Sequence, residues 1–181
     1  MLRSYMERRT CKGKEELRQA AHHVSYEIEM LDYAADHLSG WESSPPWPHG
    51  NAAKMALESF LLHFRNLRAF LCPSLQHCTA DDVLASDFLG KGDGADVGDT
   101  AQLGVDKTRL DKMLAHVTYS RSSYVEAMDY WWDIWGMLIV VFGELRKFLA
   151  LLPPEQLAWF PIAESLKERQ AQAQALVDRG R

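Results

Sequence analysis

The sequence has 181 residues, of which 47% are hydrophobic and 25% are charged, a balance that lets one domain bury a sizeable core. Its formal net charge of −5 excludes a protein that coats nucleic acid or an anionic membrane through bulk positive charge. Any site for phosphate groups must therefore be local.

The cysteines and the N-terminal segment predict a cytoplasmic protein. Cys11, Cys72 and Cys78 form no CxxC pair and leave an odd thiol, which suits a reducing compartment better than a disulfide framework. Segment 1–16 is charged and lacks the apolar stretch of a signal peptide. The longest apolar run, 136–143, is far shorter than the about 20 residues that a membrane span needs. We therefore expect no contact with a membrane.

Two long helices are predicted in the first half of the chain. Over 14–38, apolar residues recur in steps of four and three, the pattern of a helix packed lengthwise on others. The segment 40–50, rich in glycine and proline, breaks this helix. The same periodicity returns over about 52–71, with Asn51 as the predicted N-cap and Pro73 as the stop.

The middle of the chain is less regular. A short element at 81–88 precedes a segment of about 90–105 that is rich in glycine and aspartate, which we expect to be a flexible loop. Asp106 can cap a third helix that continues to about Val117.

The strongest periodicity lies in the last third of the chain. A heptad pattern predicts one helix over 124–152, ended by Pro153. Trp135 lies at a core position of this pattern, whereas Trp132 lies off it and is expected to line an interface. A final segment at about 162–178 has little apolar face, and we expect a loosely packed or partner-bound helix.

These elements predict a single all-α domain spanning 1–181, an antiparallel bundle of four to five helices. Strand-like alternation bounded by hairpin turns does not occur in the sequence, nor does an internal repeat. The sequence also lacks paired Glu-x-x-His motifs, and Cys72, His77 and Cys78 are spaced poorly for zinc, so no metal or cofactor is expected.

The candidate for chemistry is a basic pair, Arg109 and His116. The two residues are seven positions apart, so a helix places them on one face. A histidine can take the proton from a 2′-hydroxyl of RNA or return one to the leaving oxygen. An arginine can stabilise the extra negative charge on the phosphate without a metal.

The run from Arg109 through His116 to Tyr119 resembles the motif of HEPN domains, in which an arginine precedes a histidine by four to six intervening residues and a tyrosine often follows. The tyrosine comes one position later here than in the commonest spacing. The resemblance implies a HEPN-like bundle, a homodimer whose two motifs share a cleft, and a ribonuclease that acts as a toxin or in antiviral defence. It further implies RNA as substrate and an antitoxin or defence-system subunit as a protein partner.

A second match to the same motif joins Arg18, His23 and Tyr26. Five positions separate Arg18 from His23, which puts them about 140° apart around a regular helix. We therefore prefer the match formed by Arg109 and His116, because these two basic side chains lie on one face of the helix.

Three segments, 58–67, 81–88 and 112–121, resemble a group of small uncharacterised prokaryotic helical proteins, and this likeness implies a shared fold and a shared polar centre. If the two helices face each other, polar residues of both would form one cluster. Its predicted members are Glu58, His63, Arg65, Asn66, Arg109, His116 and Arg121. Buried polar residues also serve to satisfy one another and to fix helix register. The alternative is therefore a non-enzymatic helical interaction or adaptor protein whose cluster is structural.

Overall fold

The computed structural model describes residues 12–38, 50–71, 79–89, 109–111, 114 and 132–179. Every regular element within these ranges is a helix, so the prediction of an all-α helical bundle is confirmed. The loop predicted at about 90–105 lies outside the described residues, as do His116, Tyr119 and Arg121. Of the helix predicted from Asp106, the structure describes 109–111 and 114, all of them helical.

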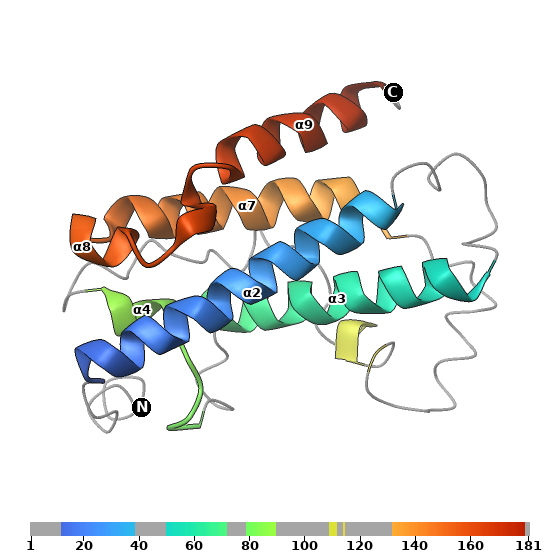
Figure 1. Ribbon diagram of the computed structural model, residues 1–181. Coiled ribbons are helices and arrows are strands. Elements are labelled where there is room, and N and C mark those ends of the chain that lie inside the picture. The colour runs from blue at the N-terminus through green and yellow to red at the C-terminus, as the bar shows by residue number, and fades with distance from the viewer. Residues whose placement is uncertain are drawn as a thin grey trace.

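The first two long helices, α2 (Lys14–Leu38) and α3 (Asn51–Leu71), pack antiparallel along their length (Figure 1). The bounds of α2 are those predicted, whereas α3 begins one residue earlier than predicted. Gly50 has a φ of 116°, and its carbonyl accepts a 3.4 Å bond from the backbone N–H of Lys54. Because a positive φ favours glycine, Gly50 takes the position before the helix. The cap predicted at Asn51 is therefore wrong by one residue.

The third long helix, α7 (Ile134–Leu151), starts later than the heptad pattern predicted. Trp132 and Asp133 are not helical, and residues 124–131 lie outside the described ranges. Asp133 caps α7 instead, since its Oδ1 accepts a 2.9 Å bond from the N–H of Gly136. A Cβ at Gly136 would lie 2.6 Å from the Asp133 Cγ, so this cap requires a glycine there. The prediction of one helix running through Trp132 is wrong.

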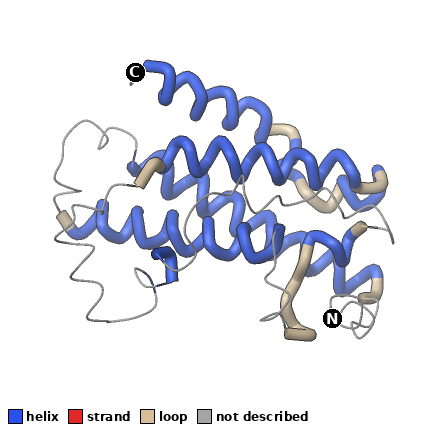
Figure 2. The backbone as a smooth tube through the Cα atoms, turned by 180° about the vertical axis from the view of Figure 1, so that it is seen from behind, coloured by secondary structure: helices blue, strands red, loops and turns tan. Residues whose placement is uncertain are grey.

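The C-terminal part of the chain folds back over α7. Two short turns, α8 (Pro154–Leu157) and η2 (Pro161–Ala163), lead into the last helix, α9 (Leu166–Arg179). The ribbon and the tube views both place α7 between α9 and the α2–α3 pair (Figures 1 and 2). Leu166 and Ala173 are the two buried residues by which α9 joins the core.

The core is one contiguous cluster of buried side chains from the long helices and from α4 (Ala85–Phe88), which falls within the element predicted at 81–88. One end of the cluster consists of four phenylalanines with ring centroids 5.1 to 6.1 Å apart in edge-on contacts, namely Phe70, Phe88, Phe148 and Phe160. These rings come from α3, α4, α7 and the turn before η2, so the cluster joins four separate segments of the chain.

A charged bridge links α9 to α2. Arg169 donates from Nε to Asp32 Oδ1 at 2.8 Å and from Nη2 to Asp36 Oδ1 at 2.6 Å. Burial raises the pKa of Asp32, although Arg169 acts in the opposite direction. Burial alone would lower the pKa of Arg169, but the bonds and charges of the two aspartates outweigh it and raise that pKa. Desolvation therefore offsets part of the attraction within the bridge.

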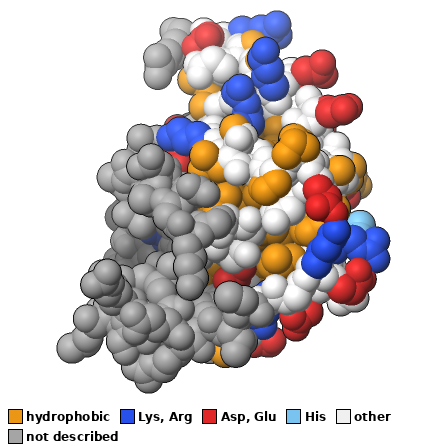
Figure 3. All heavy atoms as spheres, turned by 90° about the vertical axis from the view of Figure 1, so that its left-hand side faces the viewer, with side chains coloured by type: hydrophobic (Ala, Val, Ile, Leu, Met, Phe, Trp, Pro, Cys, Tyr) orange, Lys and Arg blue, Asp and Glu red, His pale blue; other side chains and the backbone are white. Residues whose placement is uncertain are grey.

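At the end of the bundle formed by α8 and the start of α2, apolar side chains are exposed among charged ones (Figure 3). Leu151 and Leu157 are exposed there, and Lys14 forms an ion pair with Glu155. Within the described part of the chain, no helix combines the length and the apolar character needed to cross a membrane.

Candidate functional site

The polar residues predicted on α3 make two separate sets of contacts, one on each side of the helix. His63 and Asn66 face α2, whereas Arg65 faces the helical residues 109–111. His63 and Arg65 are two positions apart, which places them about 200° apart around the helix. The described residues thus form two polar sites instead of the one cluster expected from the sequence.

The first site, which we call the Glu27 centre, consists of Glu27, His63 and Asn66. Oε2 of Glu27 lies 2.7 Å from His63 Nδ1 and accepts a 3.0 Å bond from Asn66 Nδ2. The His63 side chain is 9% exposed and that of Glu27 is 25% exposed. The ring of Tyr26 meets the imidazole edge-on, with centroids 5.9 Å apart.

The carboxylate determines which nitrogen of His63 carries the proton. An ionised Glu27 can only accept hydrogen bonds, so a neutral His63 donates from Nδ1 and keeps Nε2 as an acceptor. Asn66 holds the same carboxylate oxygen and fixes its position. The Glu27 centre is therefore an oriented histidine at the packed interface of α2 and α3.

Glu27 was not among the residues predicted for the polar cluster. A signal was available, because Glu27 follows Val24 by three positions and precedes Leu31 by four, the spacing of the buried side of α2. A carboxylate at such a position needs a hydrogen-bonding partner. The sequence does not say on which helix that partner lies.

The second site, the Arg109 junction, consists of Arg65, Arg109, Asp111 and Trp132. Arg65 Nε donates to Asp111 Oδ1 at 2.8 Å. The guanidinium of Arg109 lies over the Trp132 ring, 4.0 Å from its centroid. Leu110, between Arg109 and Asp111, is fully buried and anchors the segment to the core. Arg65 thus contacts the helical segment that carries Arg109, although Asp111 and Arg109 are two positions apart and so point about 200° apart around that segment.

Trp132, which was expected to line an interface, is instead only 5% exposed in the chain. The reason is that α7 begins after it, so the helical periodicity does not govern its direction. Among the described residues no acceptor reaches the buried Nε1 of Trp132, nor the buried Nε of Arg68, one helical turn after Arg65.

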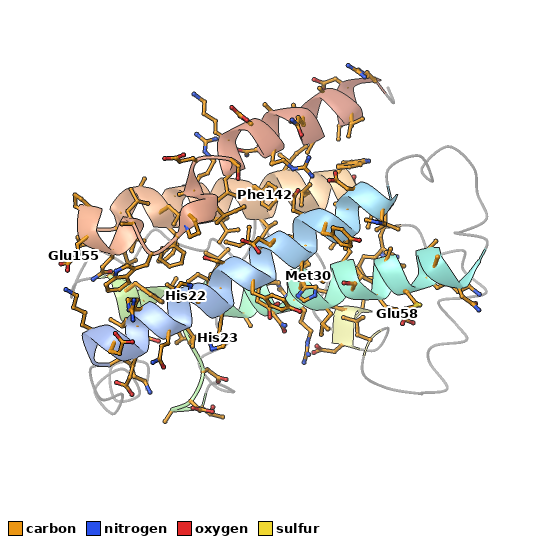
Figure 4. The ribbon with its side chains drawn as sticks, in the orientation of Figure 1. His22, His23, Met30, Glu58, Phe142 and Glu155 are labelled. Carbon is orange, nitrogen blue, oxygen red and sulfur yellow. The ribbon has the colours of Figure 1, made fainter. Side chains whose placement is uncertain are left out.

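The remaining candidates lie apart from these two sites. Glu58 is exposed on α3, and His23 is exposed on α2 (Figure 4). Arg18, the arginine of the second motif match, bonds Glu15 through Nε at 3.0 Å and Nη2 at 2.9 Å. That hydrogen bond lowers the pKa of Glu15. Arg18 is thus paired with Glu15, a residue one helical turn before it.

We expect Glu27→Ala to lower the free energy of unfolding by about 2 kcal/mol, because it removes the acceptor of two partly buried donors, each of which is destabilising by about 1–3 kcal/mol when left unsatisfied. Urea denaturation followed by circular dichroism measures the change. Glu29→Ala is the matched control, since Glu29 is exposed on the same helix. Equal midpoints for the two variants would show that the Glu27 centre does not stabilise the fold.

Among the described residues, no group of three or more histidine, cysteine, aspartate or glutamate side chains could hold a metal ion. No protein-family model matches the chain, and comparisons with curated proteins and with solved structures found no significant match. Any proposal for the function of this protein must therefore be argued from its own residues.

Proposed function

We propose that the protein is a metal-independent ribonuclease of the HEPN type that acts as a toxin or in antiviral defence. His116 is the general acid and base, Arg109 stabilises the charge on the phosphate, and Tyr119 belongs to the same site. The observation that carries the proposal is the position of Arg109, whose guanidinium lies over the Trp132 ring in a helical segment that Arg65 contacts through Asp111.

The anchoring of the segment supports this assignment. Leu110 is fully buried, and Leu114 packs against the core. These two residues are four apart and so define one side of a helix, from which Arg109 is rotated by about 100°. The spacing of seven predicts that His116 shares the direction of Arg109 and not that of Leu110.

The proposed reaction follows from these groups. His116 removes the proton of a 2′-hydroxyl, and the 2′-oxygen forms a bond to phosphorus while the bond from phosphorus to the 5′-oxygen breaks. A proton returned by histidine then neutralises the 5′-oxygen. The products are a 2′,3′-cyclic phosphate and a 5′-hydroxyl. Arg109 stabilises the phosphate oxygens, which carry more charge in the transition state.

A specific observation favours a second candidate, a non-enzymatic helical interaction or adaptor protein. Arg65 is already paired with Asp111, and Arg109 is already packed on Trp132. Contacts of this kind can have a purely structural role, which is to hold the 109–111 segment on α3. In that case the arginines are structural, and the partner of the protein is another protein.

The test is incubation of the purified protein with total RNA and with transfer RNA in the presence of EDTA, beside a His116→Ala variant. Circular dichroism checks that both proteins are folded. We expect the wild type to leave 2′,3′-cyclic phosphate ends and His116→Ala to leave the RNA intact. A folded wild type that cleaves no RNA would favour the interaction protein, and equal cleavage by both proteins would exclude His116 as the catalytic residue.

A further inference from the structure

The last helix, α9, joins the rest of the chain through few buried side chains. Of its 14 residues only Leu166 and Ala173 are buried, and Val177 is partly buried against the same core cluster. Figures 1 and 2 show α9 as the outermost long helix, on the side of α7 that faces away from the α2–α3 pair. Because the burial of an apolar side is what mainly holds a helix in place, α9 is the most weakly anchored of these long helices.

The side of α9 that faces α7 is polar at its centre. Its residues recur in steps of four and three, the spacing of a helix seam, and are Leu166, Gln170, Ala173 and Val177. Gln170 donates from Nε2 to the carbonyl of Ile139 at 3.1 Å, and its Oε1 accepts a 2.6 Å bond from Arg146 Nη1. A Cβ at Gly143 would lie 3.2 Å from the same Nε2, so the glycine leaves room for this amide. A polar residue at such a position fixes the register of two helices and lowers the stability of their contact.

The bridge from Arg169 to Asp32 and Asp36 is a second polar contact that holds α9, and solvent reaches it. The side chain of Arg169 is 24% exposed and that of Asp36 is 54% exposed. Ion pairs that water and salt can reach contribute little to stability. The burial that raises the pKa of Asp32 offsets part of the remaining attraction. The charged contact of α9 is therefore weak and depends on ionic strength.

Water can replace both polar contacts when α9 leaves. Helix geometry pairs the carbonyl of Ile139 with the N–H of Gly143, so the bond from Gln170 is the second one to this carbonyl. The charged groups of the bridge are already partly or largely exposed, and they gain further water. Departure of α9 thus leaves no group of these two contacts buried without a partner.

The segment before α9 is better anchored than α9 itself. Phe160 lies in the phenylalanine cluster, and Leu166, the first residue of α9, is fully buried. Between them Ser165 closes a turn, since its N–H and its Oγ both donate to the carbonyl of Ile162 at 3.1 Å. Beyond Leu166 only Ala173 is buried, and its side chain is a single methyl group. Leu166 therefore lies between a fixed segment and a weakly held one.

We propose that residues 167–179 of α9 are a releasable strap, which swings away from α7 about Leu166 as one unit while α2, α3 and α7 stay folded. Release uncovers the side of α7 that carries Ile139 and Gly143, on a helix whose sequence is mainly apolar. The docked strap covers this strip of α7, and the released strap makes it accessible. The proposal does not depend on ribonuclease activity and applies equally to an interaction protein.

Native-state hydrogen exchange on the full chain, measured for single amides by nuclear magnetic resonance, tests the release. A free helix of this length is only marginally stable in water, so the amides of 170–178 should share one protection factor. We expect them to exchange about 100-fold or more faster than the slowest amides of α3, with a small dependence on urea, because release exposes little surface. Fraying from the C-terminal end would instead give protection that rises steadily from Arg179 towards Leu166.

A matched pair of variants tests the bridge. Arg169→Ala should speed the exchange of 170–178 by about 5- to 10-fold and leave that of α3 unchanged, which also shows that the variant is folded. Lys167→Ala removes the same charge from an exposed position of the same helix and should change neither. Raised salt should act on the wild type as Arg169→Ala does, without any substitution.

The other outcomes of these measurements contradict the proposal. Protection of 170–178 equal to that of α3 would mean that α9 opens only when the whole chain unfolds. A steady gradient along α9 would replace release as one unit by fraying. Equal effects of Arg169→Ala and Lys167→Ala, or no effect of salt on the wild type, would overturn the role of the bridge as the contact that holds the strap.

Discussion

Arg109→Ala is expected to slow RNA cleavage in EDTA by about 10²–10³-fold, the loss that follows removal of one group that stabilises transition-state charge. The guanidinium of Arg109 lies 4.0 Å from the centroid of the Trp132 ring, and a guanidinium is a planar group that can bond two phosphate oxygens at once. The stack itself contributes about 0.5–2 kcal/mol to stability, so the variant should remain folded. Initial rates on a defined oligoribonucleotide measure the effect.

Two further variants separate charge from geometry. Arg109→Lys keeps the charge but lacks the planar fork, and we expect an intermediate rate. The double variant with Arg109→Ala and His116→Ala should cleave RNA no more slowly than the slower of the two single variants, because the two groups act in one step. A rate for Arg109→Ala close to that of the wild type would remove Arg109 from the proposed mechanism.

Phe148→Ala is expected to lower the free energy of unfolding by about 3–5 kcal/mol, because it opens a cavity in the fully buried phenylalanine cluster. The Phe148 ring contacts three others, with centroid distances of 5.1 Å to Phe70, 5.8 Å to Phe88 and 5.7 Å to Phe160. These partners lie on separate segments, so the truncation loosens several contacts at once. Urea denaturation with tryptophan fluorescence measures the change.

Phe148→Leu is the matched control, since it keeps much of the volume and should be clearly less destabilising than the alanine variant. Leu151→Ala removes an exposed side chain from the same helix and should change the stability by less than about 0.5 kcal/mol. A loss below about 1.5 kcal/mol for Phe148→Ala would mean that the cluster collapses around the missing ring.

The sequence pattern predicted the end of a helix well where a glycine or a proline follows that helix. The apolar rhythm of α2 stops before Gly40, and α7 ends at Leu151, just before Pro153. The start of α7 was mispredicted because the spacing from Trp131 to Trp135 continues the heptad pattern across Asp133. The hydrogen bond from Gly136 to Asp133 outweighs that periodicity.

The candidate site could be predicted only in part. The density of polar residues on α3 did indicate polar contacts: His63 and Asn66 make partly buried ones, and Arg65 makes an exposed one. Their partners Glu27 and Asp111 are 36 and 46 residues away from His63 and Arg65, respectively. Such pairings depend on how the helices pack, which periodicity within one helix does not determine.

The bridge from Arg169 to Asp32 and Asp36 also has a consequence for the order of folding. It joins residues 137 and 133 positions apart, whereas α2 and α3 are neighbours in the sequence. Because closing a long loop has a large entropic cost, helix pairs adjacent in sequence form first and the α9 bridge forms late. Contacts absent from the transition state act on the unfolding rate, so this bridge should set how long the native protein persists more than how fast it forms.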